Sequence, residues 1–319
     1  MDRELALEFI RVTEAAAIAS GRWIGRGDKI AADDAAVKAM RQLFDTVAIQ
    51  GKVVIGEGEM DEAPMLYIGE KVGAGHGPQV DIAVDPLEGT NLVAKNMAGG
   101  IAVLAAGPAG SLLHAPDMYM HKIAVGPVAA GKVHFNASVG ENLKAVATAL
   151  QKPISDVTLI TLDRERHYDI IAETRKAGAR VRLITDGDVS AAIATAVPDS
   201  GVDIMICTGG APEGVLAAAA LKCLGGDMQA KLAPKNDYEI QRLQEMGQEL
   251  GKLLTLSELV KSDDIIFAAT GITDGEMLRG VRYLGDQVIT HSMLMRGLTG
   301  TLRYVEARHK LGQKPTWQF

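Results

Sequence analysis

The sequence predicts an α/β protein made of two halves with different patterns of helices and strands. The chain has 319 residues, 47% hydrophobic and 23% charged, which suffices for two modest domains with sizeable cores. Before residue 152, two helical patterns precede short strand-like runs separated by glycines, as in an α+β arrangement. After about residue 156, strand-like and helical runs alternate, as in a crossover α/β layer. We therefore expect domains at 1–152 and 153–319, divided where Pro153 interrupts the pattern.

In the first half, helices are expected at residues 3–19 and 31–47. Apolar residues of the second helix recur at the spacing of one buried stripe: Val37, Met40, Phe44 and Val47. Strands are expected at 52–55, 80–84, 101–105 and 122–125. In the second half, we expect strands at 157–161, 181–185, 204–207 and 265–270, and helices at 169–176, 190–196, 212–224 and 238–253. A polar C-terminal strand completes this half.

The charge balance argues against general nucleic-acid binding. The formal net charge is −7, and no basic block is present to neutralise a phosphate backbone. Cys207 and Cys223 lie in an apolar run and in an alanine-rich helical pattern, which indicates buried thiols in a reducing compartment. No basic segment followed by an apolar one opens the sequence, and Gly107 and Pro108 interrupt the apolar run before them. We expect a cytoplasmic protein that does not enter a membrane.

Two carboxylates and a hydroxyl follow the apolar run at 80–84, in the sequence Asp-Pro-Leu-Glu-Gly-Thr at 85–90. Pro86 fixes φ and Gly89 permits positive φ, so a turn here can direct Asp85, Glu88 and Thr90 to one point. The backbone N–H groups of such a turn remain available to an anion. We interpret the segment as a strand that ends in a turn for metal and phosphate.

Other acidic residues are candidate partners for this turn. Asp33 precedes Val37 by four residues and so lies on the apolar stripe, whereas Asp34 is rotated by about 100°. Segment 55–61 reads Ile-Gly-Glu-Gly-Glu-Met-Asp, and an extended backbone would direct its three acids to one side. The alternatives are a solvated helix start and an exposed acidic loop. The glycines on both sides of Glu57 favour a metal site.

Glu213 lies at the start of the helix expected at 212–224, after Gly209-Gly210-Ala211-Pro212. An early proline and an acid in the first turn are typical of a helix N-terminus. In open α/β sheets, a helix N-terminus that follows a strand is a common place for anions to bind. The alternative is that Glu213 only complements the helix dipole.

Together these segments supply an all-oxygen set of ligands: Asp33, Glu57, Asp85, Glu88 and Glu213. Such a set matches the hard cations Mg²⁺ and Mn²⁺. The 7 histidines are scattered without zinc spacing, and there is no Gly-x-Ser-x-Gly or Walker A sequence. Hydrolysis by metal-activated water is the remaining economical mechanism.

Two polar segments follow expected strands of the second half, Arg164-Glu165-Arg166 and Asp186-Gly187-Asp188. Paired arginines can hold a phosphate by forked hydrogen bonds, and aspartates around a glycine suit sugar hydroxyls. The alternatives are a surface ion-pair cluster for the first segment and an ordinary Asp-Gly turn for the second.

Six segments occur in order along the chain: GRGDK (25–29), VIGEGE (54–59), DEAPML (61–66), DPLEGT (85–90), APDMYM (115–120) and GGAPEG (209–214). The fourth resembles the metal-binding sequence of the lithium-sensitive, metal-dependent phosphomonoesterases. With all six, the whole chain resembles the class II fructose-1,6-bisphosphatases of the GlpX type. Glu165 departs from this family's pattern, in which we expect proline in many members.

The resemblance implies a layered αβαβα sandwich of the sugar-phosphatase type with two or more Mn²⁺ or Mg²⁺ ions per site. It implies one metal ion held by Asp33 and Glu57, and another held by Asp85, Glu88 and Glu213. The implied substrate contacts are Glu88, Gly89, Thr90, Tyr119, Arg164, Glu165, Arg166, Asp186, Gly187, Asp188 and Gly210. Thr90 is expected to orient the attacking water or itself attack, Asp33 to accept a proton, and Asp61 to assist.

The implied reaction is hydrolysis of the 1-phosphate of fructose 1,6-bisphosphate to fructose 6-phosphate and phosphate, a step of gluconeogenesis, by a homo-oligomer, either tetramer or dimer. An alternative is sedoheptulose 1,7-bisphosphate as substrate, alone or with the fructose compound. An inositol monophosphatase fits less well, because a monophosphate does not need the arginine pair. A metal-dependent sugar-phosphate sensor without turnover is the alternative from a different class of protein.

Overall fold

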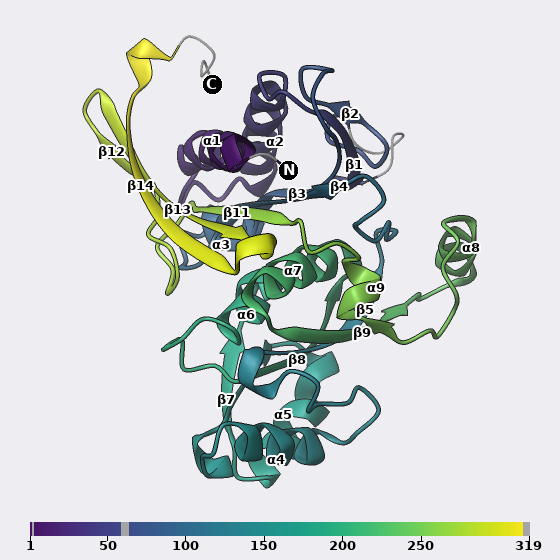
Figure 1. The fold of residues 1–319 in the computed structure, drawn as a ribbon. Helices are drawn as coiled ribbons and strands as arrows, with labels where there is room; N and C mark the ends of the chain where they lie inside the picture. Colours follow the sequence, from purple (N-terminus) through teal and green to yellow (C-terminus); the bar gives the residue numbers. More distant parts are fainter. Residues whose placement is uncertain (2, 59–63, 315–319) are drawn as a thin grey trace. The chain divides into compact units, whose positions relative to one another are not determined.

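The computed structural model describes residues 1, 3–58 and 64–314, and the chain divides into two compact units. Unit 1 comprises Met1–Leu112 and Asp264–Phe319, and unit 2 comprises Leu113–Asp263. Each unit contains one sheet with helices packed on it (Figure 1). The α/β class with layers of helices and sheets is therefore confirmed. The division differs from the boundary expected at residue 153, because the C-terminal segment returns to the first sheet.

Unit 1 contains an eight-stranded sheet in the order β12-β13-β11-β4-β3-β1-β2, with β14 paired to β13. Its strands are β1 (Gln50–Ile55), β2 (Lys71–Val72), β3 (Gln79–Glu88), β4 (Ile101–Pro108), β11 (Ile266–Gly271), β12 (Arg282–Leu284), β13 (Gln287–Arg296) and β14 (Thr301–Lys310). Its helices are α1 (Arg3–Gly21), α2 (Lys29–Phe44) and α3 (Thr90–Ala94), with 3₁₀ turns at Gly297–Thr299 and Leu311–Gln313. β1 and β3 are parallel, and β3 is antiparallel to β4.

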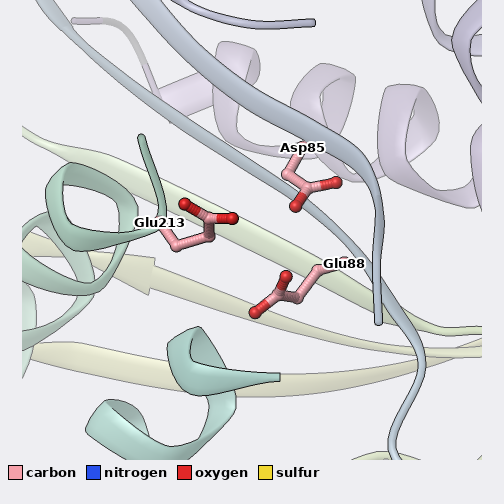
Figure 2. A group of neighbouring side chains, drawn as sticks. All are labelled: Asp85, Glu88 and Glu213. Atoms are coloured by element: carbon pink, nitrogen blue, oxygen red, sulfur yellow. The ribbon is translucent and has the colours of Figure 1, made fainter. Parts of the chain in front are cut away.

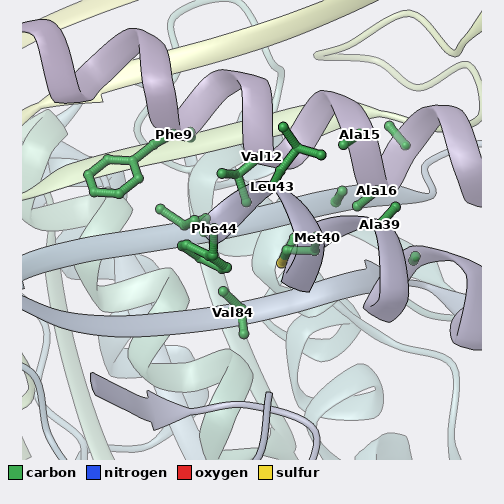
Figure 3. Packing of buried hydrophobic residues seen from close by; sticks show 14 of the residues in the cluster. Phe9, Val12, Ala15, Ala16, Ala39, Met40, Leu43, Phe44 and Val84 are labelled. Carbon is green, nitrogen blue, oxygen red and sulfur yellow. The ribbon is translucent and has the colours of Figure 1, made fainter. Parts of the chain in front are cut away.

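Helices α1 and α2 pack against each other and against the sheet of unit 1. Their contact combines small and large apolar side chains (Figure 3): Phe9, Val12, Ala15, Ala16, Ala39, Met40, Leu43, Phe44 and Val84. The alanines let the helix backbones approach, and the larger residues fill the space above the strands. The apolar stripe predicted on the second helix is confirmed for Val37, Met40 and Phe44, which are buried. Val47 is also buried, but it follows the end of α2 at Phe44 and does not lie on the helix as predicted.

The C-terminal strands belong to unit 1, whereas the sequence places them in the second half. β11 lies between β4 and β13, and β13 pairs along its length with β14. β13 was not predicted because its buried positions include Thr290 and Ser292, which interrupt the apolar pattern. Both hydroxyls are satisfied inside the core: Thr290 Oγ1 donates to Glu14 Oε1 at 3.0 Å, and Ser292 Oγ lies 2.8 Å from Thr270 Oγ1.

Unit 2 contains a six-stranded sheet in the order β10-β9-β5-β8-β6-β7. Its strands are β5 (Tyr119–Val125), β6 (Thr158–Leu162), β7 (Arg180–Ile184), β8 (Ile204–Gly210), β9 (Asp227–Ala233) and β10 (Leu254–Thr255). Its helices are α4 (Val139–Ala149), α5 (Tyr168–Lys176), α6 (Asp188–Ala194), α7 (Ala211–Leu224), α8 (Asp237–Glu245) and α9 (Leu256–Leu259), with 3₁₀ turns at Pro127–Ala129, Ile154–Asp156 and Glu165–His167. Figure 1 shows α6 and α7 on one face of this sheet and α4 and α5 on the other.

The alternation of strands and helices predicted after residue 156 is confirmed, with β6 parallel to both β7 and β8. One expected helix is too long: α8 ends at Glu245 instead of residue 253. Gly247 and Gly251 adopt φ of 72° and 75°, a left-handed conformation that stops a helix. None of the helices in the described ranges has the length and apolar character needed to cross a membrane.

We predict that Phe44→Ala destabilises the protein by about 3–5 kcal/mol, because this fully buried ring fills the space between α2 and the sheet. Urea unfolding followed by circular dichroism measures the change. Lys38→Ala, on the exposed face of the same helix, is the control and should change the free energy of unfolding by less than about 0.5 kcal/mol. Equal effects of the two substitutions would contradict this packing.

Candidate active site

Asp85 and Glu88 lie at an irregularity near the end of β3. Asp85 is opposite Val103 of β4, and Glu88 is opposite Ile101, so β3 contains one extra residue between these pairs. Pro86 lies in this bulge, where its missing N–H is not needed by the ladder. The N–H of Leu87 donates to Asp85 Oδ1 at 3.0 Å. The strand therefore continues through Glu88, whereas the sequence predicts its end at Val84.

The turn itself begins at Gly89. This residue has φ of 83°, and α3 starts directly after it at Thr90. A left-handed conformation here favours glycine, as the sequence predicts. Figure 2 shows the side chains of Asp85 and Glu88, on β3, and of Glu213, at the start of α7. Glu88 is buried, whereas Asp85 and Thr90 are half-buried. Each of the three acids offers a carboxylate oxygen suited to a metal ion.

Asp33 lies on the partly buried side of α2, as predicted, and its neighbour Asp34 is exposed. The helix begins earlier than expected because Asp28 caps it: its Oδ1 accepts from the N–H of Ala31 at 3.0 Å. Burial, with a smaller contribution from the charge of Asp34, raises the pKa of Asp33 to about 6. The carboxylate of Asp33 can therefore gain or lose a proton close to neutral pH.

Glu57 follows β1, at a place where the backbone at Gly56 and Glu57 lies close to the backbone of Leu66. Its N–H donates to the carbonyl of Leu66 at 3.0 Å. A Cβ on Gly56 would lie 1.9 Å from that same carbonyl oxygen, so glycine is required there. Glu59 and Asp61 lie outside the described residues. Within the described ranges, neither Asp33 nor Glu57 joins a group of three or more side chains able to hold a metal ion.

Glu213 lies in the first turn of α7, where Gly210 is the N-cap, Ala211 is the first helical residue and Pro212 the second. A Cβ on Gly210 would lie 1.9 Å from Glu213 Oε2, so the glycine leaves the space that the carboxylate occupies. This oxygen is buried and has no hydrogen-bond partner among the described residues. Burial, and then the charge of Asp188, raises the pKa of Glu213 to about 7, although the charge of Lys122 acts in the opposite direction.

A buried ion pair lies beside this turn. Lys122 on β5 is almost fully buried and donates from Nζ to Asp188 Oδ2 and to the carbonyl of Gly210, the latter at 2.9 Å. A Cβ on Gly209 would lie 2.0 Å from Asp188 Oδ2, so the second glycine leaves space for this carboxylate. Sequence reasoning missed Lys122. The available signal was a lysine inside the apolar strand at 122–125, where a buried charge needs a partner.

The other residues of the segment 186–188 differ in their surroundings. Asp186 is half-buried, Gly187 has φ of 89°, and Asp188 is the first residue of α6 with an exposed fraction of 6%. The left-handed Gly187 lets the chain leave β7 and enter α6 at once. Asp188 therefore forms the buried ion pair with Lys122 inside unit 2. The predicted contact of this segment with sugar hydroxyls stays a prediction.

Arg166 is held against Tyr119 of β5. Its Nε donates to the carbonyl of Thr208 at 3.0 Å, and its guanidinium carbon lies 5.0 Å from the centroid of the Tyr119 ring. Arg164 is bonded differently: its Nη2 donates to the carbonyl of Thr185 at 2.8 Å. Both arginines and Glu165 are exposed to solvent. The structure therefore leaves this segment accessible to a phosphate.

Two histidines contribute to the position of Arg166 through Thr208. The N–H of Thr208 donates to His167 Nε2 at 2.8 Å, which leaves Nδ1–H of His167 to donate to the carbonyl of Leu162 at 2.9 Å. His121 Nδ1 lies 2.7 Å from Thr208 Oγ1. Burial and then the nearby cation, Arg166 for His167 and Lys231 for His121, lower the pKa of each ring. Neutral imidazoles are therefore part of the local hydrogen-bond network.

The donor set fits a hard divalent cation. The candidate ligands are all carboxylates, and Mg²⁺ and Mn²⁺ prefer oxygen. Glu213 adds a structural argument, because a buried carboxylate oxygen without a hydrogen bond is costly unless a cation or proton satisfies it. Lys122 contributes positive charge beside Glu213 but is already bonded to Asp188 and Gly210. Oε2 of Glu213 is therefore available to bind a metal ion.

Comparison with known proteins gives one consistent result. The family model described as "Bacterial fructose-1,6-bisphosphatase, glpX-encoded" matches residues 3–309. The sequence is 50% identical to the fructose-1,6-bisphosphatase 1 class 2 of Escherichia coli K12 over 98% of this chain and 97% of that protein. The class 2 fructose-1,6-bisphosphatases of Escherichia coli O6:H1 and Shigella flexneri show the same identity and coverage.

We predict that Gly210→Ala weakens Mn²⁺ binding by about tenfold or more, because the new Cβ displaces the Glu213 carboxylate while the backbone conformation suits alanine. Isothermal titration calorimetry measures the affinity. Gly140→Ala in α4 is the control, since a Cβ there meets nothing within 4 Å. That change should leave Mn²⁺ binding unaltered and slightly stabilise the helix. Unchanged Mn²⁺ affinity in Gly210→Ala would exclude Glu213 as a ligand.

Proposed function

Because this chain belongs to the family of bacterial, glpX-encoded fructose-1,6-bisphosphatases, we propose that it hydrolyses the 1-phosphate of fructose 1,6-bisphosphate. The products are fructose 6-phosphate and inorganic phosphate, as in gluconeogenesis. The observation that carries the proposal is the carboxylate set, with Asp85 and Glu88 at the bulged end of β3 and Glu213 with a buried oxygen that lacks a hydrogen bond among the described residues. Such a set suits phosphate chemistry with a divalent cation.

We propose two metal positions, with Mn²⁺ or Mg²⁺ in each. Asp33 and Glu57 would hold the first ion, and Asp85, Glu88 and Glu213 the second. When bound, such cations neutralise phosphate charge and make a water molecule more acidic. The bulge between Asp85 and Glu88 supports the assignment, because it changes the direction of the two carboxylates relative to a regular strand.

Thr90 and Asp33 are proposed to act on the attacking water. Thr90 is the first residue of α3 and follows the left-handed Gly89. It is half-buried and lies two residues after Glu88 in the sequence. It would orient the water by a hydrogen bond. Asp33 has a pKa raised to about 6, which suits a group that accepts a proton near neutral pH. Asp61 is proposed to assist from the segment outside the described residues.

The substrate's sugar and second phosphate are proposed to bind unit 2. Arg164 and Arg166 would hold the phosphate that is not cleaved, and this positions the sugar without taking part in bond breaking. The two arginines are exposed, and the backbone carbonyl of Thr208 fixes Nε of Arg166. The remaining proposed substrate contacts are Glu88, Gly89, Thr90, Tyr119, Glu165, Asp186, Gly187, Asp188 and Gly210. Asp188 would act mainly by holding Lys122, whose Nζ also donates to the carbonyl of Gly210.

A cytoplasmic location and a homo-oligomeric state complete the proposal. Both cysteines of the chain, Cys207 and Cys223, are buried and form no disulfide. Burial, with Asp188 acting in the same direction, raises the pKa of Cys207, so this thiol stays protonated and unreactive. Buried thiols that form no disulfide are compatible with a reducing compartment.

We predict that Asp33→Ala, Glu57→Ala and Asp85→Ala each lower the rate of phosphate release from fructose 1,6-bisphosphate by more than about 100-fold, because each loses a proposed ligand. The assay uses Mn²⁺ or Mg²⁺, with sedoheptulose 1,7-bisphosphate and an inositol monophosphate tested in parallel. Asp34→Ala is the matched control for Asp33, because Asp34 is its exposed neighbour on the same helix. Turnover in Asp33→Ala equal to that in Asp34→Ala would reject the assignment of Asp33.

We predict that Arg166→Ala raises KM for fructose 1,6-bisphosphate by about 10–100-fold with kcat nearly unchanged, because a charge-assisted hydrogen bond is lost equally in the ground and transition states. Steady-state kinetics separates the two constants. Arg175→Ala, an exposed arginine in the last turn of α5, should leave both unchanged. A large fall in kcat with KM unaltered would show that Arg166 acts on the transition state instead.

A further inference from the structure

Two cations lie on the ring of Tyr119. Lys235 Nζ is 3.6 Å from the ring centroid, and the guanidinium carbon of Arg166 is 5.0 Å from it. The strands beside Tyr119 leave room for both, since its ladder partners are Gly210 on β8 and Ala233 on β9. Small residues on each side keep the ring faces open.

The backbone of Lys235 is fixed between β9 and α8. Ala233 is the last residue of β9, and Pro234 restricts the chain that follows it. The N–H of Lys235 donates to Glu239 Oε2 at 2.7 Å, and the N–H of Glu239 donates to Asn236 Oδ1 at 2.9 Å. This reciprocal cap on α8 holds the lysine's Cα, so its exposed side chain is directed to Tyr119 from a defined point.

In the described ranges, the two cations have no acidic partner. No carboxylate of residues 3–58 or 64–314 lies within ion-pair distance, 4.0 Å, of Lys235 or Arg166. Nε of Arg166 is used by the carbonyl of Thr208, and its terminal nitrogens are not hydrogen-bonded to any described residue. Two like charges that converge on one ring repel each other, and an exposed cation–π contact is a weak compensation. An anion bound between them would remove the repulsion.

A second lysine, Lys231 on β9, shows the difference. Lys231 Nζ also lies on an aromatic ring, 5.1 Å from the centroid of Phe135, but it reaches Asn136 Oδ1 at 3.3 Å. No second cation is found on the Phe135 ring among the described residues. Lys231 is therefore explained by its own contacts, whereas Lys235 is not.

We propose that Lys235 binds substrate: with Arg166, it holds the phosphate of the sugar bisphosphate that is not cleaved. This rests on the proposed function. A phosphate dianion fits the site because it can accept from the Lys235 ammonium and from the terminal nitrogens of Arg166 at the same time.

The test compares Lys235→Gln with Lys231→Gln, and both variants must retain the melting temperature of the unaltered protein. The first measurement is calorimetric binding of fructose 6-phosphate without added metal, which reports on the phosphate that is not cleaved and does not need turnover. We expect the dissociation constant to rise about tenfold in Lys235→Gln and not in Lys231→Gln. Lys235→Arg should retain most of the affinity, since it keeps the charge.

The second measurement is kinetic. With fructose 1,6-bisphosphate, Lys235→Gln should raise KM about tenfold with kcat within about twofold, and with fructose 1-phosphate it should change neither constant. Equal affinity of the glutamine variants for fructose 6-phosphate, or no binding to the unaltered protein, overturns the proposal for Lys235. Binding that depends on Lys235 in a protein that releases no phosphate would instead overturn the proposed function and leave the phosphate site standing.

Discussion

The ion pair between Lys122 and Asp188 is the constraint on which the site in unit 2 depends. Burial by itself would lower the pKa of Lys122, but the charge of Asp188, and the weaker effects of Cys207 and Glu213, raise it, so the ammonium stays charged. A buried pair of this kind is strongly destabilised when one partner is removed, by about 3–5 kcal/mol, because the other charge is left without compensation. The folded structure therefore requires Lys122 and Asp188 to be present together.

This pair determines the position of the chain that follows β8. Lys122 Nζ also donates to the carbonyl of Gly210, the residue that caps α7, and Gly209 leaves the space for Asp188. Helix α7 then begins at a fixed point with Glu213 in its first turn, and Gly210 makes room for the Glu213 carboxylate. The charge of Asp188 raises the pKa of Glu213 while that of Lys122 lowers it. One interaction thus links the start of α7, the direction of Glu213 and its affinity for a cation.

In unit 1, the comparable constraint is the bulge of β3. Pro86 cannot donate to the ladder, so one extra residue separates the pairs made by Asp85 and Glu88. Gly89 then turns the chain into α3. In unit 2, Thr208 also fixes the positions of its neighbours, because its carbonyl, N–H and hydroxyl hold Arg166, His167 and His121 respectively. In both places, backbone groups and short side chains set the geometry.

The sequence alone determined the α/β class, the partly buried side of α2 on which Asp33 lies, and the start of α7 at Ala211–Pro212, because periodicity, proline and glycine act locally. The candidate ligands followed from the chemistry of the acids. Only the tertiary structure showed that β11–β14 return to unit 1, because β11 pairs with β4 and because Thr290, on the buried face of β13, bonds to Glu14 at the other end of the chain. It also identified Lys122 and Lys235, since the meaning of each depends on a partner that periodicity cannot show: Asp188, 66 residues along the chain, for the first, and Tyr119 for the second.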